Sequence, residues 1–169
     1  MYNFSSFDLF IASTFGQTIG QGECWDYINL LWNYLGGVYY TYPPSDPSST
    51  NHGVKWGWVN SEARAANTIT HLVQVGNLNN IKRGDMVVTS GGTFGHAGFA
   101  SEDYDGSGYL KLYSQNYNNV RSVTLDSNDM STFAGAWRYD GWQPTPTTKR
   151  KGFNWVIYTR RLNDRRGKM

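Results

Sequence analysis

The sequence contains a single cysteine, Cys24, among its 169 residues. One thiol cannot form a disulfide within the chain, and this leaves the cellular compartment open. No apolar run reaches the ~20 residues of a membrane-spanning helix. The N-terminal stretch MYNFSSFDLFIASTFG lacks the positively charged start of a signal peptide. The formal net charge is only +2. We therefore expect no signal peptide, no membrane insertion and no nucleic-acid partner.

Aromatic residues and glycine are abundant instead. The chain has seven Trp, twelve Tyr and eight Phe, together with nineteen Gly. This composition favours a loop-rich domain that contains β-structure over a helical bundle. The aromatic side chains are expected first in the core, with a sugar- or peptide-binding groove as the alternative.

The N-terminal part of the chain reads as helical. A short helix or an ordered arm is expected within residues 1–19. Residues 22–35 carry apolar side chains at steps of three and four, which predicts a helix. The Pro- and Ser-rich stretch 41–53 reads as a surface loop, and residues 61–73 form a second, weaker helix candidate.

The pattern then changes to short strand-like runs separated by Gly-rich turns. Five strands are predicted, over residues 84–90, 94–101, 109–116, 120–125 and 134–139. Helices followed by an antiparallel sheet make an α+β fold. We expect one domain over residues 1–142 and a basic, aromatic C-terminal extension over residues 143–169. The extension reads either as a last strand with a solvated tail or as a contact for an acidic surface or another protein.

Cys24 lies where the helix of residues 22–35 begins. Backbone N–H groups and the helix dipole stabilise a thiolate at this position. The neighbouring Glu23 carries a charge that opposes the thiolate. Because a free cysteine has a pKa near ~8.5, nucleophilic chemistry at Cys24 needs a base.

His96 is the best candidate for that base among the three histidines. His52 lies in the Pro- and Ser-rich loop, and His71 reads as a residue of a helix end. His96 lies in the strand-like run FGHAGF, where Gly95 and Gly98 leave room for another backbone or a substrate. A structural histidine in a strand is the alternative.

The next predicted strand carries Ser114 and Asn116. Side chains alternate along a strand, so these two share a face and Gln115 points away. Across a hairpin, that face can lie beside His96. Asn116 can accept a hydrogen bond from the imidazole and orient it, whereas Ser114 reads as a packing or binding residue. An ordinary polar strand position is the alternative for both.

Four short sequence motifs follow one another along the chain: GECWDYINLLW, GDMVV, GTFGHAGF and LYSQNYN. In this order they resemble the CHAP family, the cysteine, histidine-dependent amidohydrolases/peptidases, over about residues 15–142. The resemblance implies a papain-like α+β fold. It also implies cleavage of an amide bond in bacterial peptidoglycan, by an amidase or an endopeptidase, and many members are bacteriophage lysins. By the same resemblance Cys24 is the nucleophile, His96 the general base and Asn116 the orienting residue.

The resemblance has two departures. Many members from phages carry Glu at the position of Ser114, so a Cys–His dyad is an alternative to a triad. Some members also bind calcium through an acidic loop before the cysteine, which this chain lacks. Asp103 and Asp105 resemble only half of such a loop. We therefore expect no metal and no cofactor.

The sequence leaves alternatives open for the donors that stabilise the oxyanion and for the place where the protein acts. Gln17 or Gln21 can donate a side-chain N–H to the oxyanion, as a glutamine does in papain-like sites. The expected partner is peptidoglycan, joined by other virion proteins if the chain travels in a tail. An endolysin acts from the host cytoplasm on the wall. The rival hypotheses are an NlpC-type endopeptidase and a non-catalytic virion or wall-binding protein that retains the fold.

Overall fold

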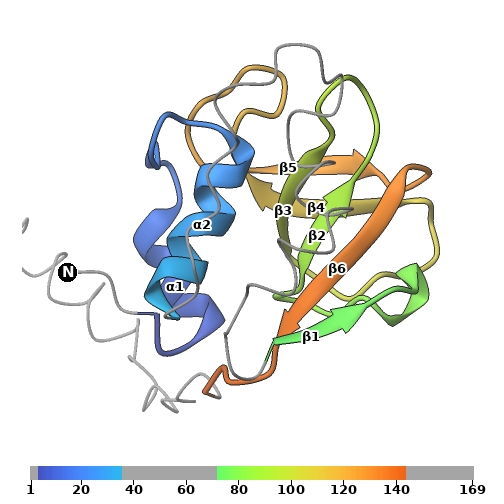
Figure 1. The fold of residues 1–169 in the computed structure, drawn as a ribbon, viewed down its shortest axis with the longest axis horizontal. Helices are drawn as coiled ribbons and strands as arrows, with labels where there is room; N and C mark the ends of the chain where they lie inside the picture. The colour runs from blue at the N-terminus through green and yellow to red at the C-terminus, as the bar shows by residue number, and fades with distance from the viewer. Residues whose placement is uncertain (1–3, 36–71, 144–169) are drawn as a thin grey trace, which may run out of the picture.

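The structure, a computed structural model, describes residues 4–35 and 72–143. In these ranges the chain forms two helices, six strands and one 3-10 turn (Figure 1). They are α1 (Phe7–Thr14), α2 (Cys24–Tyr34), β1 (Leu72–Val75), η1 (Leu78–Asn80), β2 (Met86–Thr89), β3 (His96–Ala100), β4 (Tyr109–Ser114), β5 (Thr124–Asp129) and β6 (Phe133–Tyr139).

The six strands make one antiparallel sheet in the order β1-β6-β2-β3-β4-β5. Both helices lie on the same side of the sheet, and α2 packs against β3 (Figure 1). This arrangement confirms the α+β class and the expected packing of N-terminal helices on an antiparallel sheet.

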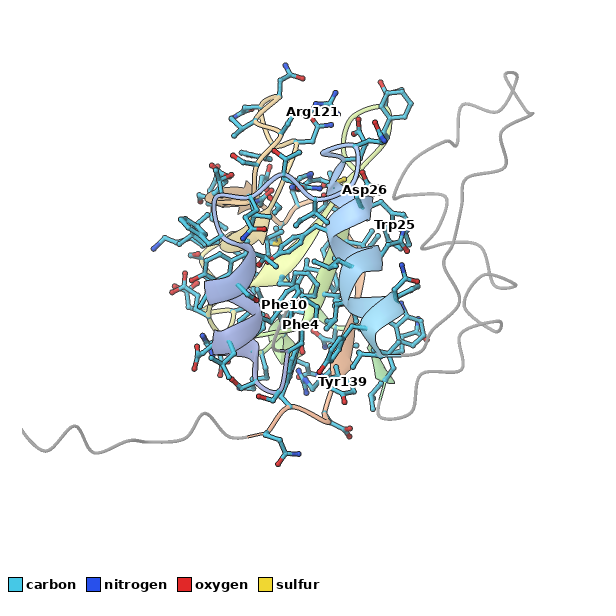
Figure 2. All side chains as sticks on the ribbon, turned by 90° about the vertical axis from the view of Figure 1, so that its left-hand side faces the viewer. Phe4, Phe10, Trp25, Asp26, Arg121 and Tyr139 are labelled. Carbon is cyan, nitrogen blue, oxygen red and sulfur yellow. The ribbon has the colours of Figure 1, made fainter. Side chains whose placement is uncertain are left out.

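A first core fills the space between the helices and the sheet. The ring of Phe10 stacks on Tyr27 at 5.2 Å and meets Phe99 edge to face at 4.9 Å. The hydroxyl groups of Thr14 and Tyr27 form a buried hydrogen bond of 2.8 Å, which ties α1 to α2. Figure 2 shows Phe10 between the two helices. Within residues 4–35 and 72–143, aromatic side chains therefore make up much of this core, as the composition favoured.

A second core covers the opposite face of the sheet. Alternation along β2 sends Met86 and Val88 toward the helices and Val87 into this second core. Leu110 and Leu112 of β4 join Val87 there, each at most 2% exposed. The sheet is thus buried on both faces.

The GD turn before β2 is held by a buried ion pair. Gly84 has a φ of 90°, which favours glycine. The carboxylate of Asp85, 1% exposed, accepts two hydrogen bonds of 2.8 Å from the guanidinium of Arg138 on β6. It also accepts the backbone N–H of Lys82. The turn therefore fixes the start of β2 against β6.

The sequence predicted most of the described elements. The helix of residues 22–35 and the strands of 84–90, 94–101 and 134–139 are confirmed as α2, β2, β3 and β6. Three expectations are wrong in their bounds. The strand expected over 109–116 is β4, which ends at Ser114. The strand expected over 120–125 is β5, shifted to Thr124–Asp129, and the last two residues of the helix expected over 61–73 belong to β1.

Several expectations fall on residues outside the described ranges. These are the loop of 41–53, the remainder of the 61–73 helix, His52, His71 and nearly all of the extension 143–169. The division at residue 142 stays a prediction. Neither described helix has the length and apolar character that a bilayer crossing demands.

Candidate active site

Cys24 is the first residue of α2, as the sequence predicted. The residue is 8% exposed and belongs to the core on the helix side of the sheet. The backbone N–H groups of Ala97 on β3, of Trp25 and of Cys24 itself lie close enough to the sulfur to lower the pKa of the thiol. Since Ala97 directly follows His96 in the chain, the thiol lies against the strand position next to the imidazole-bearing residue.

The environment of Cys24 favours the neutral thiol. Burial is the largest cause, and together with the charge of Glu23 it raises the pKa of Cys24 to about 11. The backbone N–H groups of Ala97, Trp25 and Cys24 act in the opposite direction because they stabilise a thiolate. The helix start therefore supplies donors to the sulfur, but burial outweighs them in the resting protein.

His96 begins β3 and is partly buried. Its Nε2 lies 2.9 Å from Oγ of Ser114, which is completely buried at the end of β4. The ring also contacts the ring of Tyr117, with centroids 5.3 Å apart. Burial lowers the pKa of His96 to about 4, and the charge of Asp126 partly opposes this shift. The imidazole is therefore neutral near pH 7.

Gly98, two residues after His96, lies where β3 and β4 approach each other closely. A Cβ added to Gly98 would lie 2.8 Å from Cβ of Ser114 and 2.8 Å from the carbonyl oxygen of Tyr113. No side chain fits in that space without moving β4. Gly98 thus permits the close approach of β3 and β4 that brings His96 and Ser114 together. The room expected beside His96 is taken by another backbone.

The structure corrects the expected role of Asn116. β4 ends at Ser114, and Asn116 has a left-handed backbone with a φ of 62°. Strand alternation consequently stops before Asn116, and its amide donates to the carboxylate of Glu23 instead. Its Oδ1 is buried and accepts no hydrogen bond within the described part of the chain. The residue beside the imidazole is Ser114.

Both glutamines that we considered for the oxyanion are exposed and have other partners. Gln17 is exposed, and its amide donates to the carbonyl of Ser13 at 2.8 Å. Gln21 is also exposed, and its backbone N–H donates to Asp26. Asp26 also accepts the N–H of Glu23, so its carboxylate holds the loop before α2 in place. This matches the structural role that a carboxylate near a helix start commonly plays.

The sequence analysis assigned no role in the site to two residues that lie near it, Gln115 and Asp126. Gln115 is completely buried and bonds the loop before α2. Asp126 on β5 acts electrostatically on His96, and Thr124 donates to its carboxylate. The sequence did not place Asp126 near His96 because the predicted strand ended at residue 125. Because side chains alternate along β5, Thr124 and Asp126 lie on the same face of the strand.

The acidic turn after β3 has its own partners. Asp103 accepts the ammonium of Lys82 and the backbone N–H of Arg83, both at 2.9 Å. Asp105 accepts the N–H of Ser107 in a tight turn. Across residues 4–35 and 72–143, no three His, Cys, Asp or Glu side chains group as a metal site requires.

Comparison with known proteins agrees with the fold. The chain resembles the crystal structure of the endolysin LysIME-EF1 with a TM-score of 0.51 and 17% sequence identity, over 76% of this chain and 60% of that one. Ly7917, solved alone and with the hydrolysis product of MDP, gives a TM-score of 0.49 and 17% identity, over 77% of this chain and 60% of that one.

At this identity the likeness to LysIME-EF1 shows a common fold. The chain spans less than two thirds of the length of each of these proteins. No protein-family model matches the sequence. No curated protein matches it either.

Proposed function

We propose that this chain hydrolyses an amide bond of bacterial peptidoglycan with Cys24 as nucleophile and His96 as general base. The observation that carries the proposal is the packing of α2, which begins at Cys24, against β3, which begins at His96, together with the action of the Ala97 backbone N–H on the pKa of the Cys24 thiol. It puts the thiol against the strand position next to His96, although 72 residues separate Cys24 from His96 in the chain (96 − 24). A helix-borne cysteine beside a strand-borne histidine suits acyl transfer.

The contact between His96 and Ser114 supports one assignment of the two ring nitrogens. When Nε2–H donates to Oγ of Ser114, Nδ1 is the unprotonated nitrogen that can accept a proton. In the proposed first step, Nδ1 takes the thiol proton and the sulfur attacks the scissile carbonyl carbon. The N–H groups of Cys24 and Trp25, which face the sulfur, are the available donors for the oxyanion.

The remaining steps return the enzyme to its starting state. His96 gives its proton to the leaving amine nitrogen, and the C–N bond breaks to leave a thioester on Cys24. A water molecule then loses a proton to Nδ1, attacks the thioester carbonyl and releases a carboxylic acid and the free thiol. No metal or redox partner enters this balance.

The likeness to an endolysin supports the choice of peptidoglycan as substrate. LysIME-EF1 is named an endolysin, and the present chain shares its fold at low identity. The resemblance of the four sequence motifs to the CHAP family also indicates peptidoglycan as the substrate. A phage lysin that reaches the wall from the host cytoplasm, or from a virion tail, is the setting we propose.

The decisive experiment compares wild-type protein with Cys24→Ser and His96→Ala on purified sacculi. We expect the wild type to lower the turbidity of the suspension and both variants to lose about 10³-fold or more of that rate. Mass spectrometry of the released fragments then distinguishes the MurNAc–L-Ala amide from a peptide cross-bridge. Lysis that persists unchanged in Cys24→Ser would rule out the thiol mechanism.

The burial of Cys24 favours one rival function. A thiol that is 8% exposed and has a raised pKa also suits a wall-binding or virion protein that retains the fold without activity. The same experiment separates the two functions. Co-sedimentation of wild-type protein with sacculi, with no fragments released, would favour the binding protein.

A further inference from the structure

We propose that Gln115 is a positioning residue that holds the loop of residues 19–23, and with it the start of α2, against the end of β4. Gln115 is completely buried, although the strand has already ended at Ser114. Its Oε1 accepts the N–H of Ile19 at 3.0 Å. Its Nε2 donates to the carbonyl of Ile19 at 2.8 Å and to the carbonyl of Glu23 at 2.7 Å.

These three hydrogen bonds join distant parts of the chain. Gln115 is 96 residues from Ile19 and 92 from Glu23. Both ends of the loop are held, because Ile19 is its first residue and Glu23 is the N-cap of α2. All three bonds engage backbone groups, so this amide acts directly on the backbone of the loop.

Two backbone hydrogen bonds attach the chain just before the loop to Val123, because the N–H of Gly16 donates to its carbonyl and its N–H donates to the carbonyl of Gln17. The loop of residues 19–23 lies beyond these two bonds. Gly20 and Gly22 have φ values of 58° and 82° and give it conformational freedom. Asp26 accepts the N–H groups of Gln21 and Glu23, but Asp26 belongs to α2 and moves with the helix. Among the hydrogen bonds of the described residues, those of Gln115 tie the backbone of the loop to the polypeptide that leaves β4.

The consequence concerns the two reacting groups. Ser114 holds the imidazole of His96, and the next residue, Gln115, holds the backbone that leads into Cys24. Two consecutive residues thus fix the nucleophile and the base to the same strand end. The Asn116 contact with Glu23 adds a third tie at the same place. Gln115 touches neither reacting atom, so its effect passes through the loop.

The inference predicts two changes in Gln115→Met, which conserves the side-chain volume and removes all three hydrogen bonds. The amide of Ile19 loses protection from hydrogen exchange. The sulfur of Cys24 leaves its buried contact with Ala97 and becomes more accessible, so iodoacetamide alkylates it about tenfold faster at pH 8, because alkylation follows the thiolate fraction and access. If the proposed function holds, turnover on sacculi falls at the same time.

Two control variants separate positioning from general destabilisation. Gln74→Met changes an exposed residue of β1 and should alter none of the readouts. Val87→Ala opens a cavity in the second core and lowers thermal stability, yet it should leave both Ile19 protection and Cys24 alkylation unchanged at temperatures well below unfolding. Gln115→Asn keeps a neutral amide but shortens the side chain by one methylene, so it should keep only part of the three hydrogen bonds and fall between wild type and Gln115→Met.

The alkylation and exchange measurements do not require hydrolytic activity. A wild type without activity would therefore overturn the proposed function and leave these two readouts as the test of Gln115. The positioning role is overturned if Gln115→Met folds with wild-type alkylation and wild-type exchange at Ile19. It is also overturned if Val87→Ala reproduces the same increase in alkylation. If Gln115→Met fails to fold, Gln115→Asn serves as the test under the same criteria.

Discussion

The guanidinium of Arg121 forms an ion pair with the carboxylate of Glu23, the residue that immediately precedes Cys24. Asn116 donates to the same carboxylate. Figure 2 shows Arg121 and Asp26 at the same end of the molecule, where α2 begins. The negative charge of Glu23 raises the pKa of the thiol, and a cation beside it offsets part of that effect.

Opposite shifts are expected from the two halves of this ion pair. Arg121→Gln should raise the pKa of Cys24, whereas Glu23→Gln should lower it. Each shift should be about half a pH unit, because both side chains are half exposed and solvent screens the charges. Ultraviolet absorbance of the thiolate during a pH titration measures both. Lys111→Gln, which removes an ion pair with Glu102, is the control. Shifts of the same sign in the two variants would contradict this account.

Removing the hydroxyl of Ser114 should release the ring of His96. In wild type we expect the Nε2–H tautomer, since Nε2 faces Oγ of Ser114. Ser114→Ala should allow both tautomers and slow any hydrolysis about tenfold, at a stability cost of about 1 kcal/mol. Nitrogen chemical shifts of the imidazole report the tautomer directly. Ser90→Ala removes a hydroxyl bonded to Thr132 and is the matched control.

The stability of the fold should decline on both sides of neutral pH. The pKa of His96 falls from 6.5 to about 4 on folding, so the unfolded chain takes up a proton first and stability is lost as pH drops from 6.5 to 4. The pKa of Cys24 rises from 9.0 to about 11, so stability is lost as pH increases from 9 to 11.

Each of these two losses should be on the order of 3 kcal/mol. Urea unfolding at a series of pH values measures them. His96→Gln should flatten the acidic limb alone, and Cys24→Ala the alkaline limb alone. An acidic limb that is identical in wild type and His96→Gln would assign the loss to other groups.

The charge of Asp126 is expected to support protonation of His96. Asp126→Asn should lower the pKa of His96 below about 4, because the carboxylate is the charge that opposes the effect of burial. An NMR titration of the imidazole measures the shift. Asp129→Asn, which alters the exposed acceptor of Ser131 on the same strand, should leave the pKa of His96 unchanged.

Breaking the buried ion pair between β2 and β6 should destabilise the fold strongly. Arg138→Met leaves the 1% exposed carboxylate of Asp85 without its two guanidinium hydrogen bonds. We expect a loss of about 3–5 kcal/mol in the free energy of unfolding. Arg83→Gln should cost less than about 1 kcal/mol, because its ion pair with Asp8 is exposed. Chemical denaturation of the two variants checks this difference.

The sequence predicted the central elements better than the edges. β2, β3 and β6 lie inside the sheet, where both faces are buried and apolar residues mark the strand. β1 and β5 are the two outer strands. The β5 sequence TLDSND contains residues that rarely favour strands, and pairing with β4 along six residues determines its position. Such long-range pairing leaves no local signal.

The site was predictable up to the point where the strand ended. The helix start identified Cys24, and the small neighbours of His96 identified a strand that another backbone approaches closely. Asn116 was assigned by extending the alternation two residues beyond Ser114. Its left-handed backbone, which asparagine tolerates better than most residues, redirects the side chain toward Glu23.

Because Gly98 has no side chain, β3 and β4 approach closely, and this spacing determines the position of His96. The separation of the imidazole of His96 and the hydroxyl of Ser114 depends on an atom that glycine does not have. If the proposed function holds, alanine at this position should abolish hydrolysis, because its Cβ would separate β3 from β4 while every reacting group remained in the sequence. A mutational survey of this protein should therefore score position 98 with the functional residues, and an engineered variant should leave it untouched.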